Sequence, residues 1–253
     1  VTAADFPKIS SNVIDAGEAG QIDMQDVADN CIAREKVFYD GHAVAAVAAD
    51  NAHIAEEAAN LIQVDYELLD PVMDVRSAMA DNATVLHDNF LPGAFLAPTE
   101  KALPNASKLE LAMGDVSAGF DEADIIIERE FTTETVHQGY IETHIVTAQW
   151  GANGMVTVWT TTQGQFAIRD QLALVLELPM SAITVIPLEI GGGFGGKDSI
   201  YIDPLAVVLS KQSGRPVKMV MSRAETLRAT GPSSGTYIKA RLGAMTDGTI
   251  VAA

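Results

Sequence analysis

The sequence contains one cysteine, few basic residues and no long hydrophobic run. A lone thiol, Cys31, cannot close an internal disulfide, which is typical of proteins in a reducing compartment. No apolar run approaches the ~18 residues that cross a bilayer, and the start of the chain has no secretory leader pattern. These absences predict a soluble, cytoplasmic protein. Because the first residue is Val1 and not Met, we expect the natural start to lie upstream.

Basic residues are scarce, with 16 Lys and Arg against 34 Asp and Glu and a net charge of −18. Residues 1–196 hold 8 basic and 30 acidic residues, whereas residues 197–253 hold 8 and 4. An acidic body of this strength repels nucleic acid and anionic membranes, so neither is expected as a partner. The mildly basic end could accept a small anionic ligand. The acidity also suits a surface that is simply well solvated.

The first third of the sequence has the pattern of a small α/β unit. Apolar residues recur on one face of a helix that Asp50 or Asn51 would cap, and short apolar or alternating runs flank it. We expect these strands at residues 37–39, 44–48 and 64–68. A stretch interrupted by prolines and glycines follows, which predicts an irregular connector over residues 89–124.

The second half alternates strands with helices and contains two β-hairpins. The predicted strands cover residues 128–135, 141–150, 155–161, 183–190, 217–221, 237–244 and 249–252. One helix is predicted at residues 165–178, and another from a cap at Asp203 to Gly214, with Pro204 at its first position. The whole pattern predicts an α+β fold with mixed α/β content.

Five glycines in residues 191–196 are the strongest chemical feature. Such a loop lets an anion or a flat cofactor approach backbone amides. The run also satisfies G-x-G-x-x-G and, with Lys197, most of a phosphate-binding loop. However, Asp198 replaces the Ser or Thr that would hold magnesium, and the best helix start, Asp203, lies seven residues past the last glycine. Phe194 suits a wall beside a planar substrate better than a phosphate site. A nucleotide-binding module and a turn without ligand remain alternatives.

Two further patterns carry less chemistry. Residues 231–235 match G-x-S-x-G, but a strand is predicted after them and not the helix that a nucleophile elbow requires. His137, Glu142 and His144 have the residue types of a metal site. In an extended segment, Glu142 and His144 share one face and His137 lies on the other, so we expect structural polar residues and no protein metal ligand.

Four segments occur in the order found in the molybdenum-binding subunit of the xanthine dehydrogenase and aldehyde oxidase family, and each resembles its counterpart there. They are residues 137–144 (H-Q-G-Y-I-E-T-H), 161–163 (T-T-Q), 191–197 (G-G-G-F-G-G-K) and 214–218 (G-R-P-V-K). Residues 37–47 also resemble a strand of that family's α/β-hammerhead domain. The resemblance implies a partial hammerhead domain, a connector and the N-terminal part of a molybdopterin-binding domain, at residues 1–88, 89–124 and 125–253.

The same resemblance implies a cofactor and site residues. Molybdenum in such enzymes has no side-chain ligand and is held by a molybdopterin, in some members as a cytosine dinucleotide. Gln163 matches the glutamine whose amide donates to an oxo ligand of the metal, a neutral donor in a dry pocket. Phe194 matches the aromatic wall of the substrate cavity. The backbone at Gly192, Gly193 and Gly195 matches the part of the loop that approaches the cofactor.

The reaction implied is that of an oxidoreductase acting on an aldehyde or an N-heterocycle, with water as the oxygen source. Electrons would pass to iron-sulfur clusters and FAD on other domains or subunits. In this family the general-base glutamate and the second cofactor-holding half correspond to positions past Ala253. We therefore expect this chain to be a fragment that is inactive without the remainder of the molybdenum subunit.

Three positions depart from the family pattern. Thr143 stands where a proline follows the glutamate, and Ser233 stands near the place of a substrate-binding arginine. Asp198 stands where xanthine-oxidising members carry a glutamate that touches the purine, and its shorter side chain argues against purine specificity. These departures leave a further alternative, a cofactor-free interaction domain of the same fold.

Overall fold

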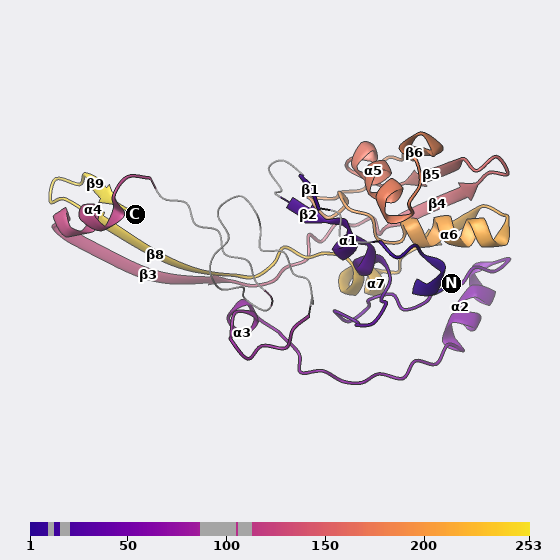
Figure 1. The fold of residues 1–253 in the computed structure, drawn as a ribbon, viewed down its shortest axis with the longest axis horizontal. Helices are drawn as coiled ribbons and strands as arrows, with labels where there is room; N and C mark the ends of the chain where they lie inside the picture. Colours follow the sequence, from indigo (N-terminus) through magenta and orange to yellow (C-terminus); the bar gives the residue numbers. More distant parts are fainter. Residues whose placement is uncertain (10–12, 16–20, 87–104, 106–112) are drawn as a thin grey trace. The chain divides into compact units, whose positions relative to one another are not determined.

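The computed structural model describes residues 1–9, 13–15, 21–86, 105 and 113–253, which form two compact units (Figure 1). The first unit joins Val1–Glu67 to His137–Pro232, and the second joins Leu68–Val136 to Ser233–Ala253. Helices and strands occur in both, which confirms the predicted α+β fold class. None of the helices in the described ranges has the length and apolar composition needed to cross a membrane.

The first unit is centred on a four-stranded sheet with the strand order β6-β5-β4-β7. β4 pairs antiparallel with β5 and with β7, whereas β5 and β6 run parallel. Alternate residues of β4 and β5 are buried, as expected where one face of a sheet is covered. The strands are β4 (Ile145–Trp150), β5 (Val156–Thr160), β6 (Ile183–Pro187) and β7 (Val217–Val220).

Two helices complete the apolar core of this sheet. α5 (Gln165–Val175) buries Leu172, and most of α6 (Asp203–Ser213) is buried. Their apolar side chains join the buried residues of β4 and β5 in one cluster. α6 ends at Gly214, whose φ of +65° is the left-handed conformation that glycine adopts without strain.

Shorter elements surround this core. The first is α1 (Met24–Cys31), which packs against α5 and buries Cys31. Asn51 caps α2 by accepting a hydrogen bond from the N–H of Ile54 at 3.0 Å. The remaining elements are η1 (Ala3–Asp5), β1 (Val13–Asp15), β2 (Gln21–Asp23), α2 (Ala52–Asn60), η3 (Met180–Ala182) and α7 (Arg223–Ala229).

The second unit is a β-ribbon with the strand order β3-β8-β9. Glu128 and Lys239 form an ion pair at 2.9 Å on one face of the ribbon. The other face carries exposed apolar side chains on either side of Arg129; we call these residues the apolar ribbon face, and they are Ile125, Ile127, Phe131, Ile238 and Leu242. The elements of this unit are α3 (Val75–Ala78), α4 (Val116–Glu122), β3 (Ile125–Thr133), β8 (Thr236–Ala244) and β9 (Ile250–Ala252).

The predicted second half is largely confirmed. Both hairpins, β4-β5 and β8-β9, form, as do α5, α6, β6 and β7. The strand predicted from residue 141 begins only at Ile145, because the preceding residues enter a network of side-chain hydrogen bonds. Asp203 is the first residue of α6 and not its cap, and its Oδ2 accepts a hydrogen bond from the N–H of Tyr201 at 3.3 Å.

The three strands predicted at residues 37–39, 44–48 and 64–68 are wrong. Residues 44–48 contain only an isolated bridge between Ala45 and Thr2, and residues 64–68 have no secondary structure and are exposed. An alternating pattern predicts an extended backbone, but a strand also needs a neighbouring strand, and no described strand pairs with residues 37–39, 44–48 or 64–68. Most of the predicted connector, residues 89–104 and 106–112, lies outside the described residues, and α4 forms near its end. The domain boundaries given above stay a prediction.

Leucine-to-alanine substitutions test where the stability of the first unit resides. Leu172→Ala on α5 should lower the free energy of unfolding by about 2–5 kcal/mol, because Leu172 is fully buried and its truncation leaves a cavity. Leu61→Ala, after α2, should change it by less than about 0.5 kcal/mol, since Leu61 is 80% exposed. Urea unfolding measures both. Equal losses in the two variants would contradict this placement of the core.

Candidate functional site

The glycine run forms a loop that leaves β6 and reaches Lys197 with unusual backbone geometry. Gly192 and Gly195 have φ angles of +91° and +83°, and Phe194 adopts a φ of +51°. The Phe194 side chain is 74% exposed. Among the described residues, none accepts a hydrogen bond from the N–H groups of Gly192, Gly193 or Phe194. The loop therefore has three consecutive backbone N–H groups without a protein acceptor, at the half-buried Gly192, the buried Gly193 and the exposed Phe194.

Most of these glycines are required by neighbouring side chains of the protein itself. A Cβ on Gly193 would collide with Oε1 of Gln163, and one on Gly196 would lie 2.7 Å from the ring of Tyr140. A Cβ on Gly191 would lie 2.7 Å from Cβ of Glu142. At Gly195, in contrast, a Cβ would meet nothing within 4 Å. The loop is thus tightly packed on its protein side and open at Gly195.

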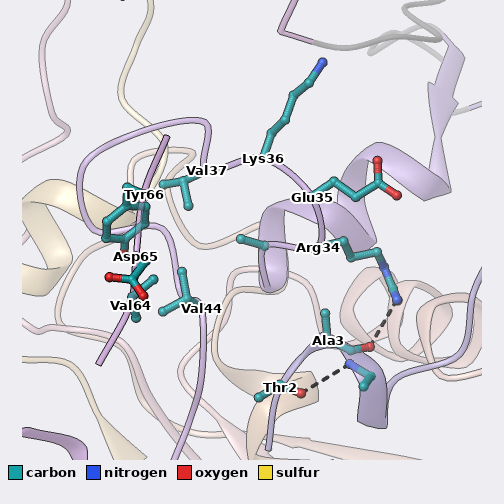
Figure 2. A pocket seen from close by; sticks show the side chains of 12 residues that line it. Thr2, Ala3, Arg34, Glu35, Lys36, Val37, Val44, Val64, Asp65 and Tyr66 are labelled. Carbon is teal, nitrogen blue, oxygen red and sulfur yellow. Dashed lines mark hydrogen bonds between the residues drawn. The ribbon is translucent and has the colours of Figure 1, made fainter. Parts of the chain in front are cut away.

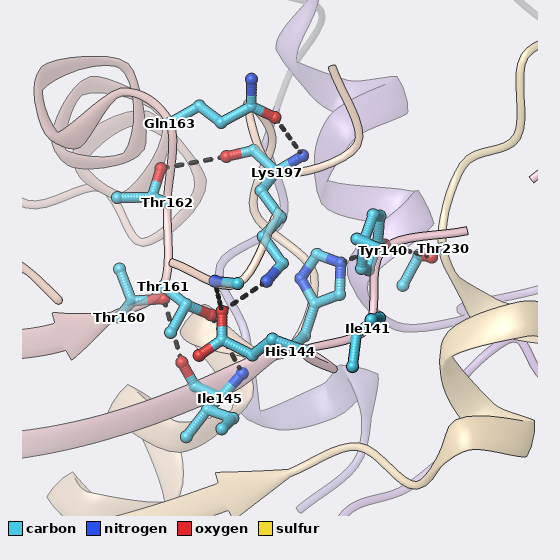
Figure 3. A network of polar contacts seen from close by, with 12 residues as sticks. Tyr140, Ile141, His144, Ile145, Thr160, Thr161, Thr162, Gln163, Lys197 and Thr230 are labelled. Atoms are coloured by element: carbon cyan, nitrogen blue, oxygen red, sulfur yellow. Dashed lines mark hydrogen bonds and ion pairs between the residues drawn. The ribbon is translucent and has the colours of Figure 1, made fainter. Parts of the chain in front are cut away.

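Gln163 is held against this loop by its carboxamide oxygen. Oε1 accepts hydrogen bonds from the N–H groups of Gly195 at 3.0 Å and Lys197 at 3.2 Å. The N–H of Gln163 in turn donates to the carbonyl of Lys197 at 3.1 Å, and the hydroxyl of Thr162 donates to the same carbonyl at 3.0 Å. Figure 3 shows the amide nitrogen pointing away from these contacts. This arrangement leaves the amide nitrogen as an outward-facing donor.

The Lys197 side chain runs inward from the loop and is fully buried. Its ammonium forms an ion pair with Oε2 of Glu142 at 2.8 Å and lies 4.9 Å from the centre of the Tyr140 ring. The same Oε2 accepts a hydrogen bond from the N–H of Gly191 at 2.8 Å. Burial raises the pKa of Glu142, but the hydrogen bonds from Lys197 and Gly191 outweigh it and keep the net pKa below its usual value.

A second network lies beside this ion pair (Figure 3). The hydroxyl of Tyr140 is 2.7 Å from Nε2 of His144 and 3.0 Å from Oγ1 of Thr230, which also contacts Nε2 of His137 at 2.9 Å. Both histidines therefore have protein partners. No group of potential metal ligands occurs among the described residues. Their expected role as structural polar residues agrees with these contacts.

Other predicted site residues lie at the border of this arrangement. Asp198 is exposed, and its main-chain carbonyl accepts a hydrogen bond from Nε2 of Gln171 at 3.2 Å. Ser233 forms an isolated bridge with Val136 ahead of β8, so no strand-to-helix elbow exists there. The helix after the glycine loop begins at Asp203 and does not follow the loop directly.

The ion pair between Glu142 and Lys197 was not predicted from the sequence. Lys197 appeared only as the end of a motif, and Glu142 only as a rejected metal ligand. The 55-residue separation between them gives no local pattern. The useful indication was the lysine itself, because a cation placed directly after a glycine loop needs an acceptor once it is buried.

A separate cavity of about 370 Å³ lies in the first unit, away from the glycine loop (Figure 2). The guanidinium of Arg34 on its wall already donates to the carbonyl of Ala3 at 3.1 Å and pairs with Asp29 at 3.2 Å. Its lining includes the exposed segment at Val64, Asp65 and Tyr66. None of these groups converges as a catalytic set would, so the glycine loop remains the candidate site.

The loop fits the backbone face of a cofactor site. The loop combines three N–H groups that have no protein acceptor, an open position at Gly195 and the exposed Gln163, whose amide nitrogen points away from its contacts with the loop (Figure 3). These groups donate hydrogen bonds and carry no negative charge, which suits oxygen and sulfur atoms of a bound group. These features make the glycine loop the candidate ligand site of this α+β domain.

Comparison with known proteins identifies the family. Residues 99–253 match the molybdopterin cofactor-binding domain, and residues 1–70 match the aldehyde oxidase and xanthine dehydrogenase a/b hammerhead domain. The chain therefore belongs to the molybdenum hydroxylase family of xanthine dehydrogenase and aldehyde oxidase. This confirms the resemblance in the four motif segments.

Individual relatives agree with this assignment. The chain is 34% identical over 227 residues to the carbon monoxide dehydrogenase large chain of Afipia carboxidovorans, covering 87% of the chain and 28% of that protein. It is 29% identical to the nicotinate dehydrogenase large molybdopterin subunit of Eubacterium barkeri, covering 88% and 49%. The structure of reconstituted CO dehydrogenase from Oligotropha carboxidovorans aligns with a TM-score of 0.78 and 30% identity, covering 99% and 31%. The chain thus spans half or less of these relatives.

The buried imidazole of His144 makes stability depend on pH. Burial and the nearby Lys197 ammonium lower the pKa of His144 from 6.5 to about 4. Between these values the unfolded chain binds a proton that the folded chain excludes, so the free energy of unfolding should fall as the pH drops from about 6.5 to about 4. At ~1.4 kcal/mol per pKa unit, the contribution of His144 amounts to roughly 3 kcal/mol.

Urea unfolding at pH 7 and pH 4.5 measures this effect. The loss on acidification should be smaller in His144→Asn than in the parent. The exposed His53 on α2 provides a matched control, and His53→Asn should lose as much as the parent. If His144→Asn has the same pH profile as the parent, the buried neutral imidazole is not a source of acid sensitivity.

Proposed function

We propose that this chain is part of an enzyme that oxidises an aldehyde or an N-heterocycle with water as the oxygen source. The observation that carries this proposal is the glycine loop, in which the N–H groups of Gly192, Gly193 and Phe194 have no protein acceptor and the backbone holds the oxygen of Gln163, so that its amide nitrogen remains as a donor. It occurs in a chain that belongs to a molybdopterin-binding family. When bound, the molybdenum cofactor would supply the redox chemistry, and the protein would orient the substrate.

Each residue at this surface has a proposed role. Gln163 donates through its amide nitrogen, since its oxygen is already bound by Gly195 and Lys197. The exposed ring of Phe194 stacks on a flat substrate. The backbone of Gly192, Gly193 and Gly195 is assigned to the cofactor, and this assignment is supported at Gly195, where a Cβ would meet nothing within 4 Å. These roles explain why the loop combines glycines with a single aromatic residue.

Asp198 bears on the substrate class. Its side chain is exposed directly after the glycine loop and is one methylene shorter than the glutamate expected of a purine-oxidising enzyme. We propose that Asp198 contacts the substrate and that the shorter carboxylate disfavours a purine. Aldehydes and simple N-heterocycles are therefore the favoured substrates.

The proposed enzyme needs more protein than this chain. Its cofactor is molybdopterin, with a cytosine dinucleotide as one form, and its electron acceptors are iron-sulfur clusters and FAD on other domains or subunits. The apolar ribbon face is the kind of surface that the remainder of a molybdenum subunit would cover. A cytoplasmic location is part of the proposal, since the lone Cys31 cannot form an internal disulfide.

Isotope incorporation tests the proposed reaction. The full-length protein with its electron-transfer partners should contain about one molybdenum per chain and transfer ¹⁸O from labelled water to the hydroxylated carbon of an N-heterocycle, which carries no exchangeable oxygen before the reaction. The 253-residue chain alone should contain far less molybdenum and show no turnover. Oxygen derived from O₂, or saturable binding of ATP or NAD in place of molybdenum, would refute the proposal. Full activity of the isolated chain would refute its dependence on other parts.

A single substitution tests the role of Gln163. In the full-length enzyme, Gln163→Glu keeps an acceptor for Gly195 and Lys197 but removes the amide donor. Loss of one preorganised donor costs about 100-fold in kcat in comparable sites, and we expect that loss with molybdenum content retained. Gln149→Leu, at an exposed position of β4, is the control and should leave kcat unchanged. An unaltered kcat in Gln163→Glu would remove Gln163 from the catalytic site.

A further inference from the structure

One carboxylate oxygen connects the two ends of the glycine loop. Oε2 of Glu142 accepts a hydrogen bond from the N–H of Gly191, where the loop begins, and from the ammonium of Lys197, where it ends, both at 2.8 Å. The N–H of Glu142 also donates to the carbonyl of Gly191 at 3.3 Å. A loop of seven residues, 191–197, is therefore closed through a single side-chain atom.

Because the ion pair between Glu142 and Lys197 is largely buried, it favours one conformation of the loop. The Lys197 side chain has no exposed surface, whereas that of Glu142 is 24% exposed. A buried ammonium without a partner is strongly disfavoured, so Lys197 must reach Glu142 whenever the loop is closed. The Tyr140 ring lies beside the ammonium and within 2.7 Å of a Cβ placed on Gly196, which leaves little room for another path.

The backbone of Lys197 transmits this constraint to Gln163. The N–H of Lys197 donates to Oε1 of Gln163 at 3.2 Å, and its carbonyl accepts from the N–H of Gln163 at 3.1 Å. Fixing the lysine side chain therefore fixes the direction in which the amide nitrogen of Gln163 points. No other ion pair within the described residues involves a lysine next to the glycine loop.

We propose that Glu142 and Lys197 are positioning residues that hold the glycine loop and the Gln163 amide in the orientation used by the cofactor and substrate. Only one part of this inference rests on the proposed function, namely the expected effect on turnover. The positioning itself is a property of the cofactor-free protein. Both are assigned a positioning role because their hydrogen bonds run to the loop and to each other.

Three variants of the full-length enzyme separate positioning from simple stabilisation. Glu142→Gln leaves the Lys197 ammonium buried without its carboxylate and should lower Tm the most. Lys197→Met removes the cation, and Glu142 keeps its contact with Gly191. The double variant Glu142→Gln with Lys197→Met has no buried charge, so its Tm should recover above that of Glu142→Gln.

In the double variant, kcat and the protection of the loop amides against hydrogen exchange should stay low although Tm recovers. In the double variant we expect kcat at least tenfold below the parent with KM within about threefold, because a missing positioning contact acts on the reacting geometry. Amide hydrogen exchange of a peptide covering residues 191–197, measured in the cofactor-free full-length protein, should be at least tenfold faster than in the parent. If Tm, kcat and the exchange rate of the double variant all return to the values of the parent, the pair only stabilises the core and the proposal is overturned.

A second ion pair provides the matched control. Glu128 and Lys239 lie 2.9 Å apart on the exposed face of the β3-β8 ribbon. The double variant Glu128→Gln with Lys239→Met should leave kcat and the exchange of residues 191–197 unchanged. An equal effect of both double variants would contradict a specific role for Glu142 and Lys197. The two proposals can fail separately. If residues 191–197 exchange faster in the Glu142→Gln, Lys197→Met double variant but the parent enzyme never binds molybdenum, the positioning role is upheld and the proposed function is rejected.

Discussion

The buried ammonium of Lys197 is the constraint on which the candidate site depends. Because it has no contact with water, it must be neutralised inside the protein, and Glu142 supplies the carboxylate at 2.8 Å. That requirement brings the segment before β4, the start of the loop at Gly191 and its end at Lys197 to one point. The amide of Gln163 then takes its direction from the same backbone. The buried charge of Lys197 at the end of the glycine run thus restricts the run to one conformation.

The secondary structure of the second half was predictable because local rules determine it. Asp247 and Gly248 mark the β8-β9 turn, and Gly214 ends α6 in a left-handed conformation. The first third was predicted less well. Residues 64–68 alternate as a strand does, yet no described strand pairs with them. Pairing joins segments distant in the chain, as in β3 with β8, and periodicity carries no information about it.

In the candidate site, too, local features could be predicted from the sequence and contacts between distant residues could not. The glycine run and Gln163 could be recognised from the sequence, but the reason for the glycines could not. The crowding at Gly193 comes from Gln163 and that at Gly196 from Tyr140, whereas Gly195 faces open space. Some glycines of the run are thus needed for close packing within the protein, and Gly195 leaves space for a ligand to approach. The pairing of Glu142 with Lys197 crosses 55 residues and required the three-dimensional structure.

The position of molybdenum in crystals of the full-length enzyme tests the central claim most directly. Anomalous diffraction at the molybdenum absorption edge locates the metal without reference to its ligands. The predicted result is a single peak next to the Gln163 amide nitrogen and the backbone of Gly193 and Phe194, within about 5 Å, the range of direct contact. A molybdenum peak elsewhere in the subunit would contradict it.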